Sequence, residues 1–388
     1  MSDPAAPLSP APPPSTPTAP GPIDLKLLQQ VCSIPTAPFF EDRIIHFLRE
    51  FVAARPALRL DQDRHGNQFI TLPGDSTQPR WVFTAHMDHP GFVARRTIDG
   101  HSVEADFYGG VQTGFFAGAK VRFFEGNREI TGTIVTTSAR IDDQPDRVTQ
   151  CLLLTEAPVA VGTLGMFDQG EGRFEAGKFL CRCCDDLAGA AACLEMLDHL
   201  IAAAPPSPVC VLLTRGEEEG FIGCLAVCQD RQLLRDDDRV IAIECSAQQT
   251  FAPQGQGVII RVGDRTSIFH SGLTYFLTQQ AEALRKIDDA FKHQRALMPG
   301  GTCEATVYDI NGFIAASLCV ALGNYHNMDK TSGNIGPEFV DVADWQNMVK
   351  LFEQLAKTGH EFELGHSALK AKLAPRFEKF RPLLARPV

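Results

Sequence analysis

The sequence predicts an α/β protein in which helices cover both faces of a mainly parallel central sheet and a small β domain is inserted into the chain. Short, continuously apolar runs such as WVFTA (81–85) are typical of strands buried in a parallel sheet. Before residue 90 and after residue 185, such runs alternate with amphipathic helical segments, which favours helices on both faces of that sheet. Residues 92–175 contain only alternating β-type segments broken by glycines, so we expect them to form the inserted domain.

The N-terminal segment has a different composition from the rest of the chain. Residues 1–22 hold nine of the 26 prolines and a single charge, Asp3. This composition cannot bury enough apolar surface to offset the loss of chain entropy, so we expect a disordered, partly polyproline tail. The expected organisation is therefore a tail at 1–22, a discontinuous α/β domain at 23–91 and 176–388 that carries the candidate catalytic residues, and a β domain at 92–175.

Hydrophobic periodicity predicts the order of elements in the α/β domain. Helices are expected within 23–55, and two strands are expected on either side of the His65-Gly66-Asn67 turn, before the buried strand at 81–85. After the insertion, the pattern predicts helices at 187–203, 221–234, 274–294 and 342–360, and strands at 209–214, 239–245 and 317–322.

The charge balance excludes some classes of partner. The chain has 36 Lys and Arg residues against 47 Asp and Glu residues, a formal charge of −11. Nucleic acids and anionic membranes attract basic surfaces, so neither is expected as a partner. No apolar stretch approaches the roughly 18 residues of a membrane span, and the N-terminus lacks the basic and apolar regions of a secretory signal. We therefore expect a cytoplasmic protein.

The sequence contains 12 cysteines, most of them inside apolar runs such as VCVLL and SLCVAL. A free thiol in such a run behaves as a small hydrophobic side chain. Cys181 and Cys184 form a C-x-x-C pattern, which is compatible with redox chemistry or a zinc site. A structural zinc would need a second pair, and Cys224 and Cys228 have the spacing of a helix instead. We expect these cysteines to pack in the core.

A histidine and an aspartate follow the first buried strand. His86 and Asp88 come directly after WVFTA, and residues two apart in an extended chain point to the same side. A metal-bound imidazole usually donates its other N–H to an acceptor, and Asp88 is placed to orient His86 in this way. The alternative is a pair of polar surface residues at the end of a strand.

Four further polar motifs open or follow predicted core segments. Asp185 and Asp186 precede a helix, where acidic residues also act as caps. The run Glu217–Glu219 follows a strand and could be a solvated turn, although three adjacent carboxylates repel one another unless cations or solvent relieve them. Glu244 ends a buried strand and needs a partner or a metal. His326 lies in YHN after SLCVALG; a lone histidine is more often structural than a ligand.

Taken together, these residues satisfy the requirements of a two-metal hydrolytic site. They supply imidazole and carboxylate ligands, which suit zinc, cobalt or manganese. One acid must bridge the ions, and a non-ligand base must take the proton of the attacking water; Glu217 is the acid left for that task. One ion would take His86, Asp185 and Glu244, and the other would take Asp185, Glu218 and His326.

The same motifs resemble those of the tetrahedral-type and glutamyl aminopeptidases, metallopeptidase family 42, within the co-catalytic zinc exopeptidases. AHMDHPGF is similar to the family's A-H-x-D-E-x-G-F, CDDLAG to D-D-R-x-G, and GEEEGFIG to Q-E-E-V-G-x-x-G. PGGTCEA resembles G-G-T-D-A, and NYHN resembles the tyrosine-containing terminal histidine motif. The motifs keep the family's order across residues 23 to 358, although NMDK stands where a glutamate is expected soon after the histidine.

The resemblance implies a zinc-exopeptidase, phosphorylase/hydrolase-like fold with an inserted β-barrel-like domain. It implies two divalent ions per subunit, zinc most readily and cobalt or manganese as alternatives, with the ligand sets given above. It also implies that Glu217 is the general base, that a water bridges the ions, and that Asp88 supports catalysis. Members form large homo-oligomers, often dodecamers, that admit peptides.

We therefore expect a cytoplasmic, homo-oligomeric metallo-aminopeptidase that removes N-terminal residues from peptides. One alternative keeps the machinery and changes the substrate, as in an N-acyl-amino-acid deacylase or a carboxypeptidase. The other is an inactive metal-binding oligomeric scaffold.

Overall fold

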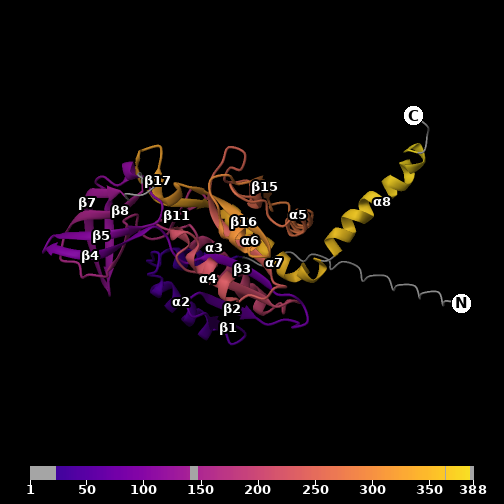
Figure 1. Cartoon of the computed structure of the whole chain (residues 1–388), viewed down its shortest axis with the longest axis horizontal. Coiled ribbons are helices and arrows are strands. Elements are labelled where there is room, and N and C mark those ends of the chain that lie inside the picture. Colours follow the sequence, from indigo (N-terminus) through magenta and orange to yellow (C-terminus); the bar gives the residue numbers. More distant parts are fainter. Residues whose placement is uncertain (1–22, 140–146, 363, 385–388) are drawn as a thin grey trace.

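A computed structural model describes residues 23–139, 147–362 and 364–384, so the expected tail at 1–22 lies outside the described residues. The sheet occupies the middle of the molecule, a β-barrel lies at one end of it, and a long helix projects from the other end (Figure 1). No helix in the described ranges is long and apolar enough to cross a membrane.

The centre of the sheet is parallel, as predicted. Its strands lie in the order β12 (Val209–Thr214), β3 (Trp81–His86), β13 (Arg239–Ala247) and β16 (Ile314–Gly323). Every residue of β3 and β12 is buried, which explains their continuously apolar sequences. The parallel strands end at the same edge, where α/β sheets place their binding sites.

The flanking strands pair antiparallel, so the parallel prediction holds for the centre of the sheet only. On one side lie β1 (Arg59–Gln62) and β2 (Gln68–Leu72), and on the other β19 (Glu338–Asp341), β11 (Lys178–Cys181) and β10 (Arg173–Glu175). β14 (Val258–Gly263) pairs antiparallel with β16 and parallel with β15 (His293–Leu297).

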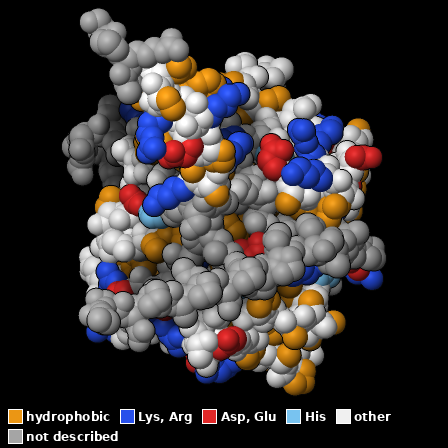
Figure 2. Space-filling model, turned by 90° about the vertical axis from the view of Figure 1, so that its right-hand side faces the viewer, with side chains coloured by type: hydrophobic (Ala, Val, Ile, Leu, Met, Phe, Trp, Pro, Cys, Tyr) orange, Lys and Arg blue, Asp and Glu red, His pale blue; other side chains and the backbone are white. Residues whose placement is uncertain are grey.

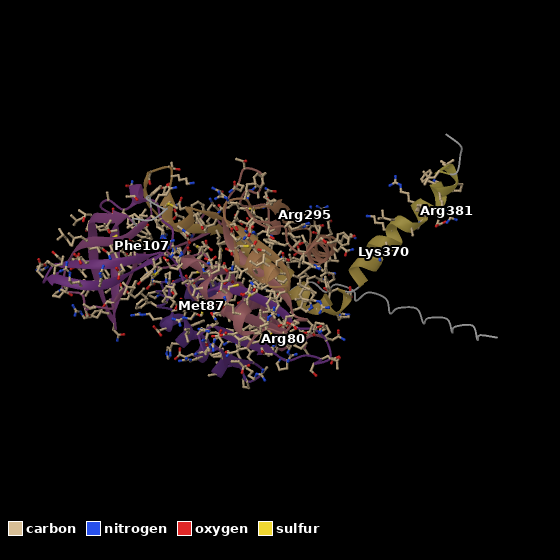
Figure 3. The ribbon with its side chains drawn as sticks, in the orientation of Figure 1. Arg80, Met87, Phe107, Arg295, Lys370 and Arg381 are labelled. Carbon is tan, nitrogen blue, oxygen red and sulfur yellow. The ribbon has the colours of Figure 1, made fainter. Side chains whose placement is uncertain are left out.

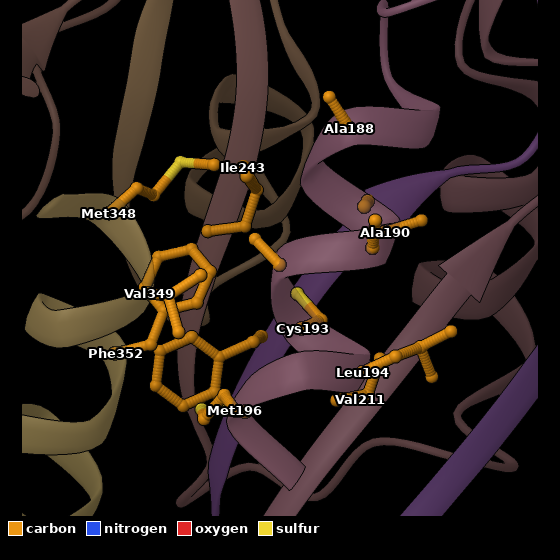
Figure 4. Close-up of a cluster of buried hydrophobic side chains, with 14 of the residues drawn as sticks. Ala188, Ala190, Cys193, Leu194, Met196, Val211, Ile243, Met348, Val349 and Phe352 are labelled. Carbon is orange, nitrogen blue, oxygen red and sulfur yellow. The ribbon is translucent and has the colours of Figure 1, made fainter. Parts of the chain in front are cut away.

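Helices cover both faces of the sheet. The larger core joins one face to α1 (Lys26–Cys32), α2 (Asp42–Ala53), α3 (Leu187–Ile201), α5 (Ser271–Arg285) and α7 (Val342–Thr358). Figure 4 shows part of this core, in which Cys193 and Met196 of α3 lie beside Phe352 of α7 and Ile243 of β13. The other face is covered by α4 (Ile222–Asp230) and α6 (Glu304–Ile310).

The region between the two parts of the α/β domain contains a closed barrel. Its strands are β4 (Gly91–Asp99), β5 (Ser102–Tyr108), β6 (Lys120–Glu125), β7 (Arg128–Ala139), β8 (Val148–Thr155) and β9 (Leu164–Phe167). Burial alternates along β5, and Phe92, Phe107, Phe116 and Phe167 form the aromatic centre of the barrel. The barrel-like fold predicted for this region is confirmed.

Three predicted elements differ from the structure. The helix expected at 274–294 ends at Arg285, because Ile287 and Asp288 turn back onto Leu284 and the next residues reach β15. The helix expected at 221–234 ends at Asp230, since Arg231 adopts a left-handed conformation. The closing helix was expected to run to residue 360, but α7 ends at Thr358 and a single 3-10 turn follows.

The structure also contains a helix that the sequence pattern did not predict, α8 (Leu364–Leu384). It carries Lys370 and Arg381 away from the α/β domain (Figure 3). Figure 2 shows basic and acidic side chains interspersed on this end of the molecule, so the acidic excess does not gather there.

Candidate metal centre

The predicted ligands meet at the carboxyl edge of the parallel strands. His86 is the last residue of β3, and Glu244 lies in β13. Glu217 and Glu218 lie in a 3-10 turn after β12, Asp185 lies between β11 and α3, and His326 lies in a 3-10 turn after β16. Met87, which follows His86, marks this position between the barrel and the sheet (Figure 3).

Three groups of side chains have their ligand atoms within 4.8 Å of one another: His86, Glu217 and Glu218; His86, Asp185 and Glu244; and Asp185, Glu218 and His326. Asp185 belongs to the last two, with Oδ1 3.5 Å from His86 Nε2 and Oδ2 3.9 Å from His326 Nε2. Its two oxygens thus face different histidines, the arrangement that a bridging carboxylate needs. We call His86, Asp185 and Glu244 the sheet group, and Asp185, Glu218 and His326 the turn group.

Main-chain carbonyls fix the tautomer of both histidines. His86 Nδ1 lies 3.0 Å from the main-chain oxygen of Asp88, and His326 Nδ1 lies 2.7 Å from that of Gly110. A carbonyl oxygen only accepts, so each Nδ1 carries a proton and each Nε2, which faces the carboxylates, is the atom left to bind a metal ion. Metal-binding histidines are oriented by such contacts.

The residues fit a pair of divalent cations. Asp185 Oδ1 and Glu244 Oε1 are buried and accept no hydrogen bond from the described part of the chain, and Glu218 Oε1 lies 3.1 Å from His326 Nε2. A buried carboxylate oxygen without a donor is costly, and a cation would relieve that cost. Imidazole and carboxylate ligands are the set that zinc, cobalt and manganese accept.

Asp88 differs from its expected role. Its carboxylate is 3.7 Å from His86 Nδ1, and the main-chain oxygen of Asp88 orients that ring instead. The carboxylate accepts the main-chain N–H groups of Glu217 at 2.9 Å and Glu218 at 3.0 Å. Asp88 therefore holds the acidic turn in place. Glu217 Oε2 lies 3.9 Å from His86 Nε2, at the edge of the ligand cluster.

Burial and mutual charge shift the pKa values of these groups. Burial raises the pKa of Glu217 well above its usual value, that of Asp88 to about 7 and that of Glu244 to about 8. Glu218 and His326 shift each other's pKa in the direction opposite to burial. Burial would raise the pKa of Glu218, but the imidazolium of His326 lowers it to about 2. Burial would lower the pKa of His326, but the carboxylate of Glu218 raises it to about 9.

Glu338 is a supporting residue that the sequence did not reveal. Its carboxylate accepts the N–H groups of Cys184 at 2.7 Å, Asp185 at 3.0 Å and His326 at 2.8 Å. The glutamate expected soon after His326 is absent because a short hairpin, β17 (Met328–Asp329) and β18 (Asn334–Ile335), intervenes. The sequence signal for Glu338 was an acid at the start of the strand that follows this hairpin, β19.

A cavity of about 350 Å³ opens beside Glu244. Arg261 and Lys330 both line it. Arg261 is 3% exposed, and its buried Nε has no hydrogen-bond partner among the described residues, so this atom is available to a ligand. Gly300, Gly301 and Cys303 of the PGGTCEA motif and Tyr325 line the same cavity.

The cysteines are consistent with packing. All 12 lie in the described ranges, and all are buried and free of disulfides. Cys181 and Cys184 are fully buried, and burial raises the pKa of Cys181 to about 11. A protonated, inaccessible thiol is a poor nucleophile and a poor metal ligand.

Comparison with known proteins extends these observations. The model of the M42 glutamyl aminopeptidase family matches residues 66–351. No functionally curated protein matches the chain.

Solved structures share the fold at low sequence identity. Aminopeptidase APDkam598 from the archaeon Desulfurococcus kamchatkensis is 19% identical, with a TM-score of 0.71 over 86% of this chain and 94% of that one. A TET aminopeptidase from the marine sediment archaeon Thaumarchaeota archaeon SCGC AB-539-E09 is 17% identical, with a TM-score of 0.72 over 87% and 99%. The Pyrococcus horikoshii TET1 peptidase, described as assembling into a tetrahedron or a large octahedral shell, is 19% identical, with a TM-score of 0.69 over 86% and 98%.

The structural likeness shows the fold, and the family match gives the assignment. Because the family model matches well over half of its residues, this chain belongs to the M42 glutamyl aminopeptidase family and is a metallo-aminopeptidase.

Proposed function

We propose that the chain removes N-terminal residues from peptides with two co-catalytic divalent ions, most readily zinc, and with Glu217 as the proton-transfer residue. One observation carries the proposal: the two oxygens of Asp185 face His86 and His326 separately. The sheet group and the turn group would each hold one ion. When bound, the two ions would polarise the scissile carbonyl and lower the pKa of the attacking water, so that it loses a proton more readily.

Glu217 is placed to move the proton of that reaction. Its Oε2 lies near His86 Nε2 without belonging to the sheet group or the turn group. Burial raises its pKa, which makes the carboxylate a stronger base than an exposed glutamate. Glu217 would take a proton from the attacking water and deliver it to the leaving amine, while Asp88 fixes the main chain of the turn.

The cavity beside Glu244 would receive the N-terminal side chain of the substrate. With Glu244 engaged by an ion, Arg261 and Lys330 would give this cavity a positive charge, which suits an acidic side chain. We also propose a homo-oligomer, since the structurally similar Pyrococcus horikoshii peptidase is described as assembling into closed shells.

A substrate panel tests the activity. The chain is incubated with added zinc or cobalt and with peptides that have either a free or an acetylated N-terminus. Release of residues from the N-terminus and from the C-terminus is measured separately. We expect cleavage of the free-amine peptides only. Cleavage restricted to blocked peptides would support a deacylase instead, and cleavage from the C-terminus would support a carboxypeptidase. No cleavage by a protein that binds both ions would support an inactive scaffold.

The Glu217→Gln variant tests the proton-transfer role. We expect it to lose hydrolysis by at least ~10²-fold while still binding two ions. Glu175→Gln is the matched control, because Glu175 is an exposed glutamate of β10. Unchanged hydrolysis in Glu217→Gln would overturn the role of Glu217.

A further inference from the structure

The barrel contacts both loops that supply the turn group. The segment that follows β5 reaches His326 through the main-chain oxygen of Gly110, 2.7 Å from Nδ1. The N–H of the preceding residue, Gly109, donates to Glu219 Oε1 at 2.7 Å. Arg147, next to strand β8 of the barrel, donates to the same oxygen of Glu219. The barrel thus holds one loop by a main-chain contact and the other by an ion pair.

Glu219 is bonded to the barrel and not to the ligand cluster. It directly follows Glu217 and Glu218, yet it belongs to neither the sheet group nor the turn group. Its side chain is 13% exposed and that of Arg147 is 19% exposed, so solvent screens the pair less than a surface ion pair. The family pattern Q-E-E-V-G has valine at this position, so the ion pair is additional to the motif.

Glu217–Glu219 form a single 3-10 turn between Gly216 and Gly220, both left-handed, with φ of 61° and 102°. Main-chain hydrogen bonds close the turn, with the N–H groups of Gly220 and Phe221 donating to the main-chain oxygen of Glu217. Contacts from other elements set its position: Glu41 accepts the N–H of Gly216, Asp88 accepts those of Glu217 and Glu218, and Glu219 joins the turn to the barrel.

We propose that Arg147 and Glu219 are positioning residues that fix the acidic turn to the barrel. The affinity of the turn group for its metal ion would then depend on this contact between the turn and the barrel. This inference rests on the proposed function, in which Glu218 is a ligand. It gives the inserted domain a role in the active site of its own subunit, although the barrel supplies no ligand side chain. The sheet group depends less on such support, because two of its three ligands, His86 and Glu244, lie within paired strands.

Arg147→Ala separates positioning from charge. Removal of a cation near several carboxylates would strengthen metal binding if charge alone mattered. Removal of a positioning contact would weaken it, typically by about 10-fold or more. We expect the weaker of two zinc or cobalt dissociation constants, measured by titration of the full chain, to rise about 10-fold while the tighter one is unchanged. An unchanged or tighter second constant would overturn the proposal.

A double-variant cycle tests whether the effect passes through the pair. In a Glu219→Val background, Arg147→Ala should add no further loss, because its partner is already gone. Equal losses in both backgrounds would overturn the proposal. Arg147→Lys should restore part of the affinity, since it keeps the charge without the planar fork. Arg96→Ala, which breaks an exposed barrel pair with Glu104, is the matched control and should leave both constants unchanged.

Far-UV circular dichroism and thermal melting establish that each variant is folded. If Arg147→Ala fails to fold, Glu219→Gln carries the same comparison, because it keeps an acceptor for the Gly109 N–H and loses the ion pair. The wild-type titration distinguishes the two proposals. A wild type that binds fewer than two ions would overturn the proposed function, whereas a two-ion wild type with an unaffected Arg147→Ala variant would overturn only the positioning role.

Discussion

The sheet group and the turn group share Asp185 but are built on different kinds of backbone. In the sheet group, His86 and Glu244 lie in β3 and β13, whose main chains are paired to neighbouring strands. In the turn group, Glu218 and His326 lie in single 3-10 turns. His326 itself has a left-handed φ of 54°, a conformation that non-glycine residues adopt only when their surroundings enforce it.

The difference shows what fixes the ligands in each kind of backbone. In a strand in the middle of a sheet, hydrogen bonds to the neighbouring strands fix the position of the last residues. A turn must be fixed by other elements: Asp88 binds the N–H groups of the acidic turn, Glu338 binds that of His326, and Gly110 binds its ring. The turn group should therefore bind its ion more weakly than the sheet group does. Its affinity should also be more sensitive to substitutions of residues that bind no metal.

The largest effect is expected at the residue that the two groups share. Asp185→Ala should lose both ions and lower hydrolysis by at least ~10³-fold, because metal ions supply several kcal/mol of transition-state stabilisation and each 1.36 kcal/mol is about tenfold in rate. Metal content after dialysis, measured by atomic emission, checks this. Retention of one tightly bound ion would show that Asp185 serves a single group.

Variants specific to one group test the comparison directly. Glu244→Gln should remove the tighter of two binding events and Glu218→Gln the weaker, each by about 10²-fold, with the other event retained. Calorimetric titration of the metal-free protein with zinc resolves the two events. The reverse assignment, in which Glu218→Gln removes the tighter event, would contradict the argument from backbone.

Asp88→Asn tests the same difference between the two groups, with a smaller expected change in metal affinity. The amide keeps one acceptor for the N–H groups of Glu217 and Glu218 and turns a donor toward the other. The main-chain oxygen that orients His86 is unaffected. We therefore expect the turn group to lose about 10-fold in metal affinity and the sheet group much less. Equal losses in both groups would mean that Asp88 acts through charge and not through the turn.

The same contrast explains what could be predicted from the sequence. His86, Glu244 and Asp185 follow or end apolar strands or precede a helix, so the edge where they meet was predictable from periodicity alone. Glu338 was not predictable, because a hairpin separates it from His326 and its partners are main-chain N–H groups. The contact of Gly110 with His326 uses a carbonyl, which leaves no signature in side-chain chemistry.

The fold follows a similar division. Continuously buried strands and strongly amphipathic helices were recognised, whereas β15 was not: its first two residues, His293 and Gln294, were assigned to the end of a helix. Its sequence, HQRAL, is largely polar and is partly exposed at the edge of the sheet, so neither apolar continuity nor strict alternation marked it as a strand.

A pH dependence of metal affinity separates the two groups by the protons that each releases when its ion binds. A ligand must be deprotonated to bind a metal, so a raised pKa means that binding expels a proton and that affinity increases with pH. Burial sets the pKa of Glu244 at about 8. Burial would lower the pKa of His86, but Glu217 and Asp185 raise it well above its usual value, and Glu218 raises that of His326 to about 9. Between pH 6 and 8 the turn group should therefore release about one proton on binding its ion, and its affinity should fall about tenfold for each unit of decrease in pH. The sheet group should release protons from both His86 and Glu244, so its affinity should fall more steeply, whereas the turn group should continue to gain up to about pH 9. Titrations in buffers of different ionisation enthalpy count the protons directly, and an affinity independent of pH in this range would contradict the pairing of His326 with Glu218.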